Sequence, residues 1–275
     1  MKVIGYDTSK LHSNNIVNAM LKSVDGEFLS IKDFKDNGIR EADLVIISGI
    51  LRGTGLVYKE CIKQNRNFLF IDHAYFNKGY DYPTWMRITK NRHVFGPALT
   101  NRPSDRFAQF NAKYKLEKWR GGTGDYILIL PPTHAISWLF NNHTWEEEIV
   151  AKIKSITNRP IKIRAKPENP IVDDFGNLVR MELNKTADIP LLDDIKSAYA
   201  VVAYNSNSVI ECVKQGVPTI CSENCATFPI SFKIEDLITD KFLTEPNRQQ
   251  LFNDLAYEQF NIDEMTAGLP YQLLK

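Results

Sequence analysis

Short apolar runs alternate with amphipathic segments along the first half of this chain of 275 residues. The runs have the length of buried strands, and the segments between them repeat apolar residues at helical spacing. Strands that alternate with helices in this way are typical of a parallel sheet in an α/β protein. The predicted strands are residues 2–6, 27–31, 43–48 and 67–71, and the predicted helices are residues 14–23 and 56–65.

The second half repeats this arrangement after the glycine-rich segment 120–124, where Trp119 to Asp125 mark the expected boundary. Asn261 followed by Glu264 has the spacing of a capping box and predicts a final helix. The sequence therefore predicts an α/β protein with two domains, residues 1–120 and 121–275. In the second domain we expect strands at 125–130, 160–164, 200–204 and 218–220, helices at 144–157, 191–198, 209–214 and 246–258, and a loop region at 167–185.

The segment 198–218 carries the most distinctive pattern. A buried strand is followed by the polar cluster Asn205-Ser206-Asn207-Ser208 and then by an amphipathic helix. This order places a helix N-terminus just beyond the strand, where its partial positive charge suits a phosphate. Glu211 lies one turn into the helix, where its carboxylate can accept hydrogen bonds from a sugar hydroxyl. An ordinary crossover with a well-capped helix would give the same pattern.

The stretch S-N-S-V-I-E-C-V-K-Q-G-V-P-T-I resembles the donor-site segment of GT-B-fold glycosyltransferases. The resemblance implies that Asn205 belongs to the donor loop, that Ser206, Asn207 and Ser208 face the diphosphate of a nucleotide-sugar, and that Glu211 holds its ribose. It also implies two Rossmann-like domains that face each other across a crevice, with a C-terminal helix that crosses back onto the first domain. The expected co-substrate is a nucleotide-sugar, with a UDP-sugar as the first choice, and no separate cofactor is required.

Arg164 and Lys166 alternate at the end of a predicted strand, so we expect both side chains on one face. Two cations there could neutralise a departing diphosphate, which a metal ion does in other glycosyltransferases. The phrase is similar to the Lys-Pro-His-Pro element of capsule-type GT-B transferases, although Glu168 stands where that family has His. No DxD motif ends a predicted strand, and the four cysteines contain no CxxC pair, so we expect no metal site. Exposed cations at a strand end are the alternative.

Transfer of a sugar to a hydroxyl needs a base that takes the hydroxyl proton. Asp72 and His73 directly follow the predicted strand 67–71, and Asp7 follows the first predicted strand. The resembled family commonly places one Asp, Glu or His of the N-terminal domain in this role. We therefore predict Asp72 and His73 as catalytic candidates, with Asp7 as their rival. A turn-forming Asp and a half-buried His would give the same pattern.

Charge is unevenly distributed although the net charge is only +1. The segment 87–120 has nine Lys and Arg residues and two acidic ones, with aromatic residues in or near it. Cations interleaved with aromatic rings suit a nucleic-acid backbone and an unstacked base. We therefore expect DNA as the acceptor, with a hydroxymethylated pyrimidine as the target. The chain also resembles phage-encoded DNA glycosyltransferases. The acceptor-binding candidates are Arg52, Arg87, Lys90 and Arg92. A solvated segment balanced by the acidic C-terminal residues is the alternative.

Other functions stay open at this level. A surface or capsular glycan could be the acceptor, and the same two-domain layout occurs in sugar-nucleotide epimerases, for which His134 would be the nearby acid–base candidate. A non-catalytic nucleotide-sugar-binding module is a further alternative. The 43% hydrophobic content without an apolar run of about 20 residues predicts no membrane insertion. We expect a cytoplasmic protein with reduced thiols, in the host cytoplasm if it is phage-encoded, and the oligomeric state stays open.

Overall fold

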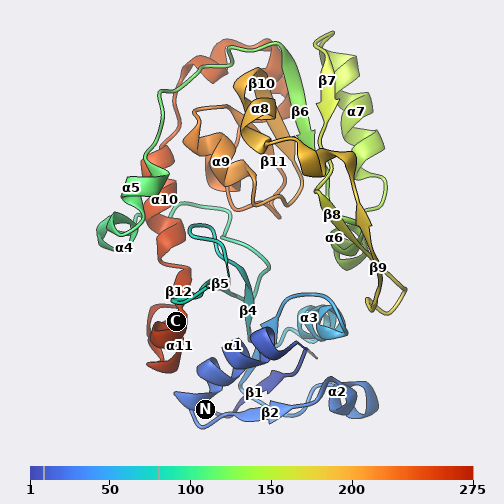
Figure 1. Cartoon of the computed structure of the whole chain (residues 1–275), viewed down its shortest axis with the longest axis vertical. Helices are drawn as coiled ribbons and strands as arrows, with labels where there is room; N and C mark the ends of the chain where they lie inside the picture. Colours follow the sequence, from blue (N-terminus) through green and yellow to red (C-terminus); the bar gives the residue numbers. More distant parts are fainter. Residues whose placement is uncertain (9, 80, 275) are drawn as a thin grey trace. The chain divides into compact units, whose positions relative to one another are not determined.

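The computed structural model describes residues 1–8, 10–79 and 81–274, which form two compact units (Figure 1). The first unit comprises Met1–His93, Val172–Val179 and Leu255–Lys275, and the second comprises Val94–Ile171 and Arg180–Asp254. This division groups residues 94–120 with the second unit, whereas the sequence predicted a boundary between residues 120 and 121.

The first unit is built on a six-stranded sheet with the strand order β12-β5-β4-β3-β1-β2. Neighbours among β1 to β4 run parallel, which confirms the predicted parallel arrangement. β5 and β12 extend this sheet with antiparallel pairing, and neither was predicted. The strands are β1 (Val3–Tyr6), β2 (Glu27–Leu29), β3 (Leu44–Ser48), β4 (Phe68–His73), β5 (Trp85–Lys90) and β12 (Gln259–Asn261).

Helices cover both faces of this sheet. Leu69 and Ile71 of β4 belong to a buried cluster with residues of α1 (Leu11–Lys22) and α11 (Ile262–Thr266). Phe68 and Phe70 point the other way and contact the ring of Tyr58 in α3 (Thr54–Lys63), with centroid distances of 5.2 and 5.5 Å. Burial on both faces explains why these strands are apolar throughout. The remaining helices of this unit are α2 (Ile31–Asn37) and α12 (Leu269–Leu273).

The predicted capping box at the start of α11 is confirmed. The Asn261 side chain accepts a hydrogen bond from the Glu264 N–H at 2.9 Å, and the Glu264 carboxylate accepts one from the Asn261 N–H at 3.1 Å. The residue before this box, Phe260, lies in β12 and pairs with Met86 of β5. The C-terminal segment is therefore part of the first unit's sheet and core.

The second unit contains a four-stranded parallel sheet with the order β11-β10-β6-β7. Its strands are β6 (Tyr126–Leu130), β7 (Ile161–Ile163), β10 (Ala198–Ala203) and β11 (Thr219–Cys221). The α-helices are α4 (Asp105–Ala108), α5 (Asn111–Tyr114), α6 (His134–Phe140), α7 (Trp145–Ile156), α8 (Leu191–Lys196) and α9 (Val209–Lys214), and α10 (Arg248–Ala256) leads from this unit into the C-terminal segment. Short 3₁₀ helices cover Lys185–Asp188, Phe228–Ile230, Ile234–Ile238 and Asp240–Leu243.

Both faces of this sheet are buried as well. Leu128 and Leu130 of β6 join a cluster that contains residues of α8 and α9. The alternate residues Ile127 and Ile129 join a second cluster with Ile153 of α7. A parallel sheet covered by helices on both faces is the Rossmann-like arrangement that the apolar strands predicted.

One prediction about the segment between β7 and α8 is wrong. Residues 167–185 were expected to form a loop region, but they contain the two-stranded hairpin of β8 (Glu168–Val172) and β9 (Leu178–Leu183). From Val179 to Leu183 apolar and charged residues alternate strictly, which is the period of a strand. Figure 1 shows this ribbon as a separate element beside β7.

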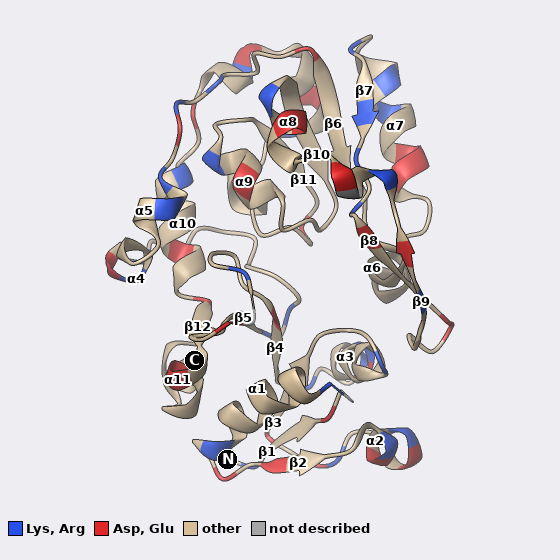
Figure 2. Ribbon diagram, in the orientation of Figure 1, with Lys and Arg blue, Asp and Glu red and all other residues tan. Residues whose placement is uncertain are grey.

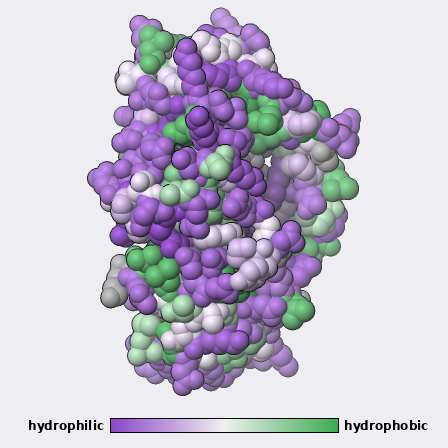
Figure 3. Space-filling view, turned by 60° about the vertical axis from the view of Figure 1, so that its left-hand side comes forward, coloured by the Kyte–Doolittle hydropathy of each residue, from purple (hydrophilic) through white to green (hydrophobic). Residues whose placement is uncertain are grey.

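The surface carries no broad hydrophobic area on the face shown in Figure 3, where hydrophobic side chains form small groups among hydrophilic ones. Within the described residues, no helix is both long enough and apolar enough to span a membrane.

Candidate functional site

Three loops lie at the carboxyl edge of the second unit's sheet. The register pairs Leu130 of β6 with Ala203 of β10, and Ala203 with Cys221 of β11. Because these strands are parallel, the segments that follow them lie at the same edge: residues 131–133, 204–208 and 222–224. Ligands of open α/β sheets bind at this edge. The predicted donor loop therefore has the position that its role requires.

Hydrogen bonds tie the 204–208 loop to the 222–224 loop. The Ser222 hydroxyl donates to the Tyr204 carbonyl at 2.6 Å, and the Asn205 side-chain amide donates to the Asn224 carbonyl at 2.6 Å. The Asn224 amide in turn donates to the Tyr204 hydroxyl at 3.1 Å. The amide group of Asn205 thus holds the loop in shape. Asn224 was not predicted, and only its place after the next strand could have indicated it.

The start of α9 differs from the prediction. The predicted helix N-terminus requires its first N–H groups to point into the crevice above the strand, but the N–H groups of Val209, Ile210 and Glu211 bond the carbonyls of residues 206–208. The side-chain cap is Ser206, whose hydroxyl accepts from the Ser208 N–H at 3.2 Å, whereas the Ser208 side chain makes no cap hydrogen bond. A ligand at this loop would therefore meet side-chain hydroxyl and amide groups, not the backbone donors of Val209 to Glu211.

Glu211 lies in the first turn of α9, as predicted, with a side chain that is 25% exposed. Its Oε1 accepts hydrogen bonds from Lys214 Nζ at 3.1 Å and from Gln215 Nε2 at 3.0 Å. These two donors fix the carboxylate in place. A fixed, partly exposed carboxylate is the kind of group that can bind vicinal hydroxyls, provided that the ligand reaches its exposed side.

The prediction that Arg164 and Lys166 share one face is wrong. β7 ends at Ile163, and the Arg164 side chain turns inward, where it is 8% exposed. Its guanidinium pairs with Asp194 and donates to the carbonyl of Ile189 at 2.7 Å. Asp194 also pairs with Lys162. These cations compensate the burial of Asp194 and hold the pKa of its carboxyl below the usual range, although burial alone would raise it. Arg164 is therefore a structural residue, and only Lys166 lies exposed.

His134 begins α6 directly after the first of the three loops. Its N–H donates to the Asn169 side chain at 2.8 Å, and its ring lies 6.0 Å from the ring of His143, centroid to centroid. The sequence analysis missed His143. The short helix α6 and the left-handed turn at Asn141 bring His143 back toward His134, and this cannot be read from the spacing along the chain. In the described part of the chain, no group of three His, Cys, Asp or Glu residues is placed to hold a metal ion.

The predicted residues of the first unit also gather at one carboxyl edge. β1, β3 and β4 are adjacent and parallel, and Ser48 at the end of β3 pairs with Ile71 of β4. Asp7 follows β1, and its N–H donates to the Leu29 carbonyl at 2.9 Å. Arg52 lies in the loop after β3 in the left-handed region, with φ of 61°. Asp7, Arg52 and the Asp72-His73 pair are therefore close to one edge of this sheet.

Asp72 is the counter-ion of a buried arginine. Its Oδ2 lies 2.8 Å from Arg87 Nη2, and its Oδ1 accepts from the His73 N–H at 2.8 Å. Burial raises the pKa of Asp72, but the charge of Arg87, followed by smaller contributions from His73 and His93, outweighs it and leaves the pKa at about 2. A carboxylate with so low a pKa is a weak base at neutral pH.

His73 differs from Asp72 because its side chain is exposed. It lies close enough to His12 to lower the pKa of His12, an effect second to the burial of His12. His12 follows β1 at the start of α1, so the edge carries two imidazoles. Of the predicted acid–base candidates, His73 combines an exposed ring with a position at the end of β4.

The basic segment does not form one exposed surface. Arg87, predicted to contact the acceptor, is 2% exposed, and that prediction is wrong because its charge is needed inside the sheet. Arg120 donates to the carbonyls of Ile195 and Ala198 at 2.7 and 3.0 Å. Arg92 pairs with Glu258 at 2.6 Å, and Lys90 is half-buried. Figure 2 shows acidic residues on α4 and α10 beside the basic residues of α5.

The aromatic residues near this segment are also buried. Tyr75, Phe76 and Phe95 are at most 2% exposed, and Trp85 is 8% exposed. Rings in the core cannot stack on an extruded base. Lys113, Lys115 and Lys118 are exposed, but apart from the half-buried Trp119 the rings on which the DNA acceptor depended lie in the core.

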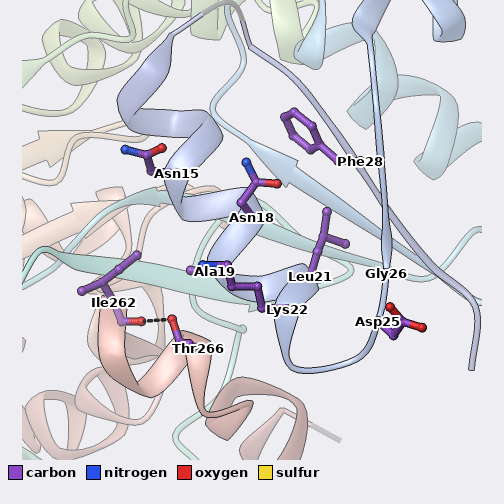
Figure 4. A pocket seen from close by; sticks show the side chains of 10 residues that line it. All are labelled: Asn15, Asn18, Ala19, Leu21, Lys22, Asp25, Gly26, Phe28, Ile262 and Thr266. Carbon is purple, nitrogen blue, oxygen red and sulfur yellow. Dashed lines mark hydrogen bonds between the residues drawn. The ribbon is translucent and has the colours of Figure 1, made fainter.

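A pocket of about 630 Å³ in the first unit lies away from these residues. It is formed by α1, β2 and α11, and Figure 4 shows Asn15 and Asn18 on the helix and Phe28 on the strand. Its lining contains none of the predicted site residues: Asn15, Asn18, Ala19, Leu21, Lys22, Asp25, Gly26, Phe28, Ile262 and Thr266.

No protein-family model and no curated protein sequence matches the chain. Among solved structures it is similar to the β-Kdo 2,7 transferase of Thermosulfurimonas dismutans KpsC, with a TM-score of 0.50 and 12% identity over 100% of this chain and 99% of that chain. The β-Kdo 2,4 transferase of the same KpsC gives a TM-score of 0.49 at 12% identity, covering 100% and 98%. The Methanocaldococcus jannaschii UDP-GlcNAc 2-epimerase gives 0.29 at 11% identity, covering 91% and 97%.

The first of these similarities spans the whole chain. Because the sequence identity is only 12%, the similarity is evidence for the fold alone. Together with the two helix-covered sheets, it confirms the predicted fold class. The chain has a GT-B-like fold with two Rossmann-like α/β units.

Proposed function

We propose that this protein is a GT-B-type glycosyltransferase that moves a sugar from a nucleotide-sugar to an acceptor hydroxyl. The observation that carries the proposal is the pair of hydrogen-bonded polar loops at the carboxyl edge of β10 and β11, with Glu211 in the helix that follows the first of them. A fold similar over its full length to a glycosyltransferase supports the same conclusion.

The second unit binds the donor in this proposal. Glu211 accepts hydrogen bonds from the ribose, and the side chains of Ser206, Asn207 and Ser208 bind the diphosphate. Lys166 is an exposed cation in the loop after β7 and balances the phosphate charge. A UDP-sugar is the first donor to test, and a nucleotide-activated Kdo is the second, because the similar transferase is named for that sugar.

The first unit supplies the base. A nitrogen of His73 takes the proton of the acceptor hydroxyl, and the acceptor oxygen forms a bond to the anomeric carbon of the sugar. The bond between that carbon and the phosphate oxygen breaks, and its electron pair leaves with the nucleotide. Asp72 does not take the proton, because its ion pair with Arg87 keeps it ionised and weakly basic. Asp7 is the rival base.

The acceptor we favour is a hydroxyl of a glycan. The buried Arg87 and the buried rings around it weaken the case for a nucleic-acid acceptor, although Lys113, Lys115 and Lys118 are exposed. Arg52, Lys90 and Arg92 remain the candidates for contact with an acidic acceptor. Hydroxymethylated DNA is retained as a comparison in the test.

The experiment is a donor-turnover assay. Purified protein is incubated with UDP-hexoses, UDP-GlcNAc and nucleotide-activated Kdo, each with a panel of oligosaccharides or with hydroxymethylated DNA. Nucleotide release and the mass of each acceptor are measured. Transfer to a glycan that falls by about 10²-fold or more in His73→Ala supports the proposal. Transfer to DNA only would overturn the glycan acceptor, and binding of no donor would overturn the glycosyltransferase function.

The pair of His134 and His143 supports a second candidate, a sugar-nucleotide epimerase. Two imidazoles 6.0 Å apart, next to the donor loops, could remove and return a proton. This function predicts a change of the donor without any acceptor, lost in His134→Ala but kept in His73→Ala. Analysis of the recovered nucleotide-sugar in the same assay separates the two functions.

A further inference from the structure

The hairpin of β8 and β9 has two outer edges, and in the described chain no other strand pairs with either of them. Its turn is fixed by Asp173, whose Oδ1 accepts from the N–H groups of Phe175 and Asn177 at 2.9 and 2.8 Å. Within the described chain, the two strands pair only with each other. Pro170 lies in the middle of β8 and lacks an N–H, which makes the outer edge of β8 a poor partner for another strand. The outer edge of β9 has no such protection.

The side chains of β9 separate into two kinds. Val179, Met181 and Leu183 alternate along one face and are 61, 45 and 75% exposed. Arg180 and Glu182 alternate along the other face, and their side chains are 63 and 47% exposed. An exposed strand with an apolar face is a site at which another strand adds to a sheet. Charges usually protect such an edge, but here the two charges have opposite sign.

The charges and apolar residues of β9 match those of a second β9 strand that runs antiparallel to it. If two copies pair antiparallel about a two-fold axis at Met181, Arg180 lies opposite Glu182 of the second copy, and Glu182 lies opposite Arg180. In the same register Val179 lies opposite Leu183, so apolar residues also face apolar residues. Opposite charges and apolar pairs at directly facing positions stabilise antiparallel strands.

The charges also select this register against its neighbours. Facing residues of paired strands direct their backbone groups either both to the shared edge or both away from it, so the register can change only in steps that keep this alternation. The step in one direction places Arg180 opposite Arg180, and the step in the other places Glu182 opposite Glu182. Both arrangements bring like charges together and are unfavourable. One arrangement remains, and it has the isologous symmetry of a two-fold dimer.

We propose that two copies of this chain associate through antiparallel pairing of their β9 strands, which joins the two hairpins into one four-stranded ribbon. The association is independent of the enzymatic function. It is weak and salt-dependent, because the selecting charges are exposed and are screened at high ionic strength.

The test is sedimentation velocity over a wide range of protein concentration, starting with the wild-type chain of 31.5 kDa. We expect the wild type to shift toward twice this mass as concentration rises. Arg180→Glu alone and Glu182→Arg alone place like charges opposite each other and are expected to remain monomers. An equimolar mixture of these two variants restores opposite charges at both positions and should form a heterodimer. The double variant R180E/E182R should dimerise like the wild type.

Lys152→Glu is the matched control, because it makes the same change of net charge at an exposed ion pair outside β9. It should leave the association unchanged, and circular dichroism should show every variant folded. A wild type that stays monomeric at all concentrations would overturn the proposal. So would an Arg180→Glu variant that dimerises as strongly as the wild type, or single variants whose mixture gives no heterodimer.

A cross-link gives a second readout that does not depend on the charge variants. In the proposed register Met181 of one chain lies opposite Met181 of the other. The thiols of two Met181→Cys chains are therefore next to each other. Oxidised glutathione then converts the two thiols to one intermolecular disulfide and is reduced to two molecules of glutathione. Leu192→Cys, at an exposed position outside β9, is the control. Equal cross-linking of both variants would contradict the proposed axis.

Discussion

Arg87 and Asp72 face each other across β5 and β4, and Arg87 Nη2 lies 2.8 Å from Asp72 Oδ2. The sequence placed these residues in two different roles, Arg87 at an acceptor and Asp72 in catalysis. In the structure each compensates the charge of the other inside the first unit. In the proposed function this pair leaves His73, not Asp72, to act as the base.

Removal of one partner of this pair should destabilise the protein more than removal of both. Asp72→Asn leaves a buried guanidinium without a counter-charge and is expected to lower the free energy of unfolding by about 3 kcal/mol. The double variant with Arg87→Met should lose clearly less than the sum of the single changes. Urea denaturation of the four proteins measures this difference. Asp193→Asn, which removes an exposed ion pair with Lys196, is the control and should cost less than about 1 kcal/mol.

His93 should make the protein sensitive to mild acid. Burial, and then the charge of Arg87, lowers the pKa of His93 to about 3, although Asp72 opposes the effect. In the unfolded chain this imidazole binds a proton below about pH 6.5, whereas in the folded protein it stays neutral to about pH 3. The unfolded state therefore binds more protons in this window, and stability falls as pH decreases through it.

His93→Phe tests this dependence, since a phenyl ring can keep the contact with Phe70, at 4.6 Å between centroids. The loss of unfolding free energy between about pH 7 and pH 4 should be smaller in this variant by about 3 kcal/mol. His143→Phe, at an exposed histidine, should follow the wild-type profile. An unchanged profile in His93→Phe would show that another group causes the acid sensitivity.

Glu211 should contribute to donor affinity more than to the rate of the chemical step. Glu211→Gln keeps the shape but removes the charge that strengthens hydrogen bonds to ribose hydroxyls, so the donor Kd should rise by about tenfold or more. Calorimetric titration with a bound donor or its nucleoside diphosphate measures the change. Lys214→Met removes the ion pair with Glu211 but keeps the carboxylate, and it should have a smaller effect. Equal losses in both variants would indicate that the pair, and not the carboxylate, matters.

Two glycines with the same φ should respond differently to alanine. Gly216 and Gly38 both have φ of 73°, but a Cβ at Gly216 would lie 2.2 Å from the Lys118 carbonyl oxygen, whereas nothing lies within 4 Å of a Cβ at Gly38. Gly38→Ala should cost about 1–3 kcal/mol for the backbone alone, because φ of 73° with ψ of −163° is a conformation that essentially only glycine adopts. Gly216→Ala should cost at least about 3 kcal/mol, because the backbone must also move. Thermal unfolding of both variants measures the difference, and similar losses would contradict the close contact.

The fold class could be predicted because apolar strands and amphipathic helices are local patterns. The runs around Ile46, Phe70 and Val201 are apolar at every position, which only a sheet covered on both faces requires. β5 was missed for the opposite reason. Its sequence contains Arg87 and Lys90, and a charge inside a strand is compatible with burial only if another segment supplies a counter-charge.

Within the candidate site, the sequence determined the loops but not the state of their side chains. The order of strand, polar loop and helix fixed the positions of Ser206 and Glu211, because a parallel strand must end where its loop begins. Tertiary structure alone decided that Arg164 turns toward Asp194, thirty residues away along the chain, and that Arg87 meets Asp72 across the sheet. A charged residue has the same local pattern whether it is exposed or buried. Its partner comes from a distant segment, and only the folded chain brings the two charges within reach of each other.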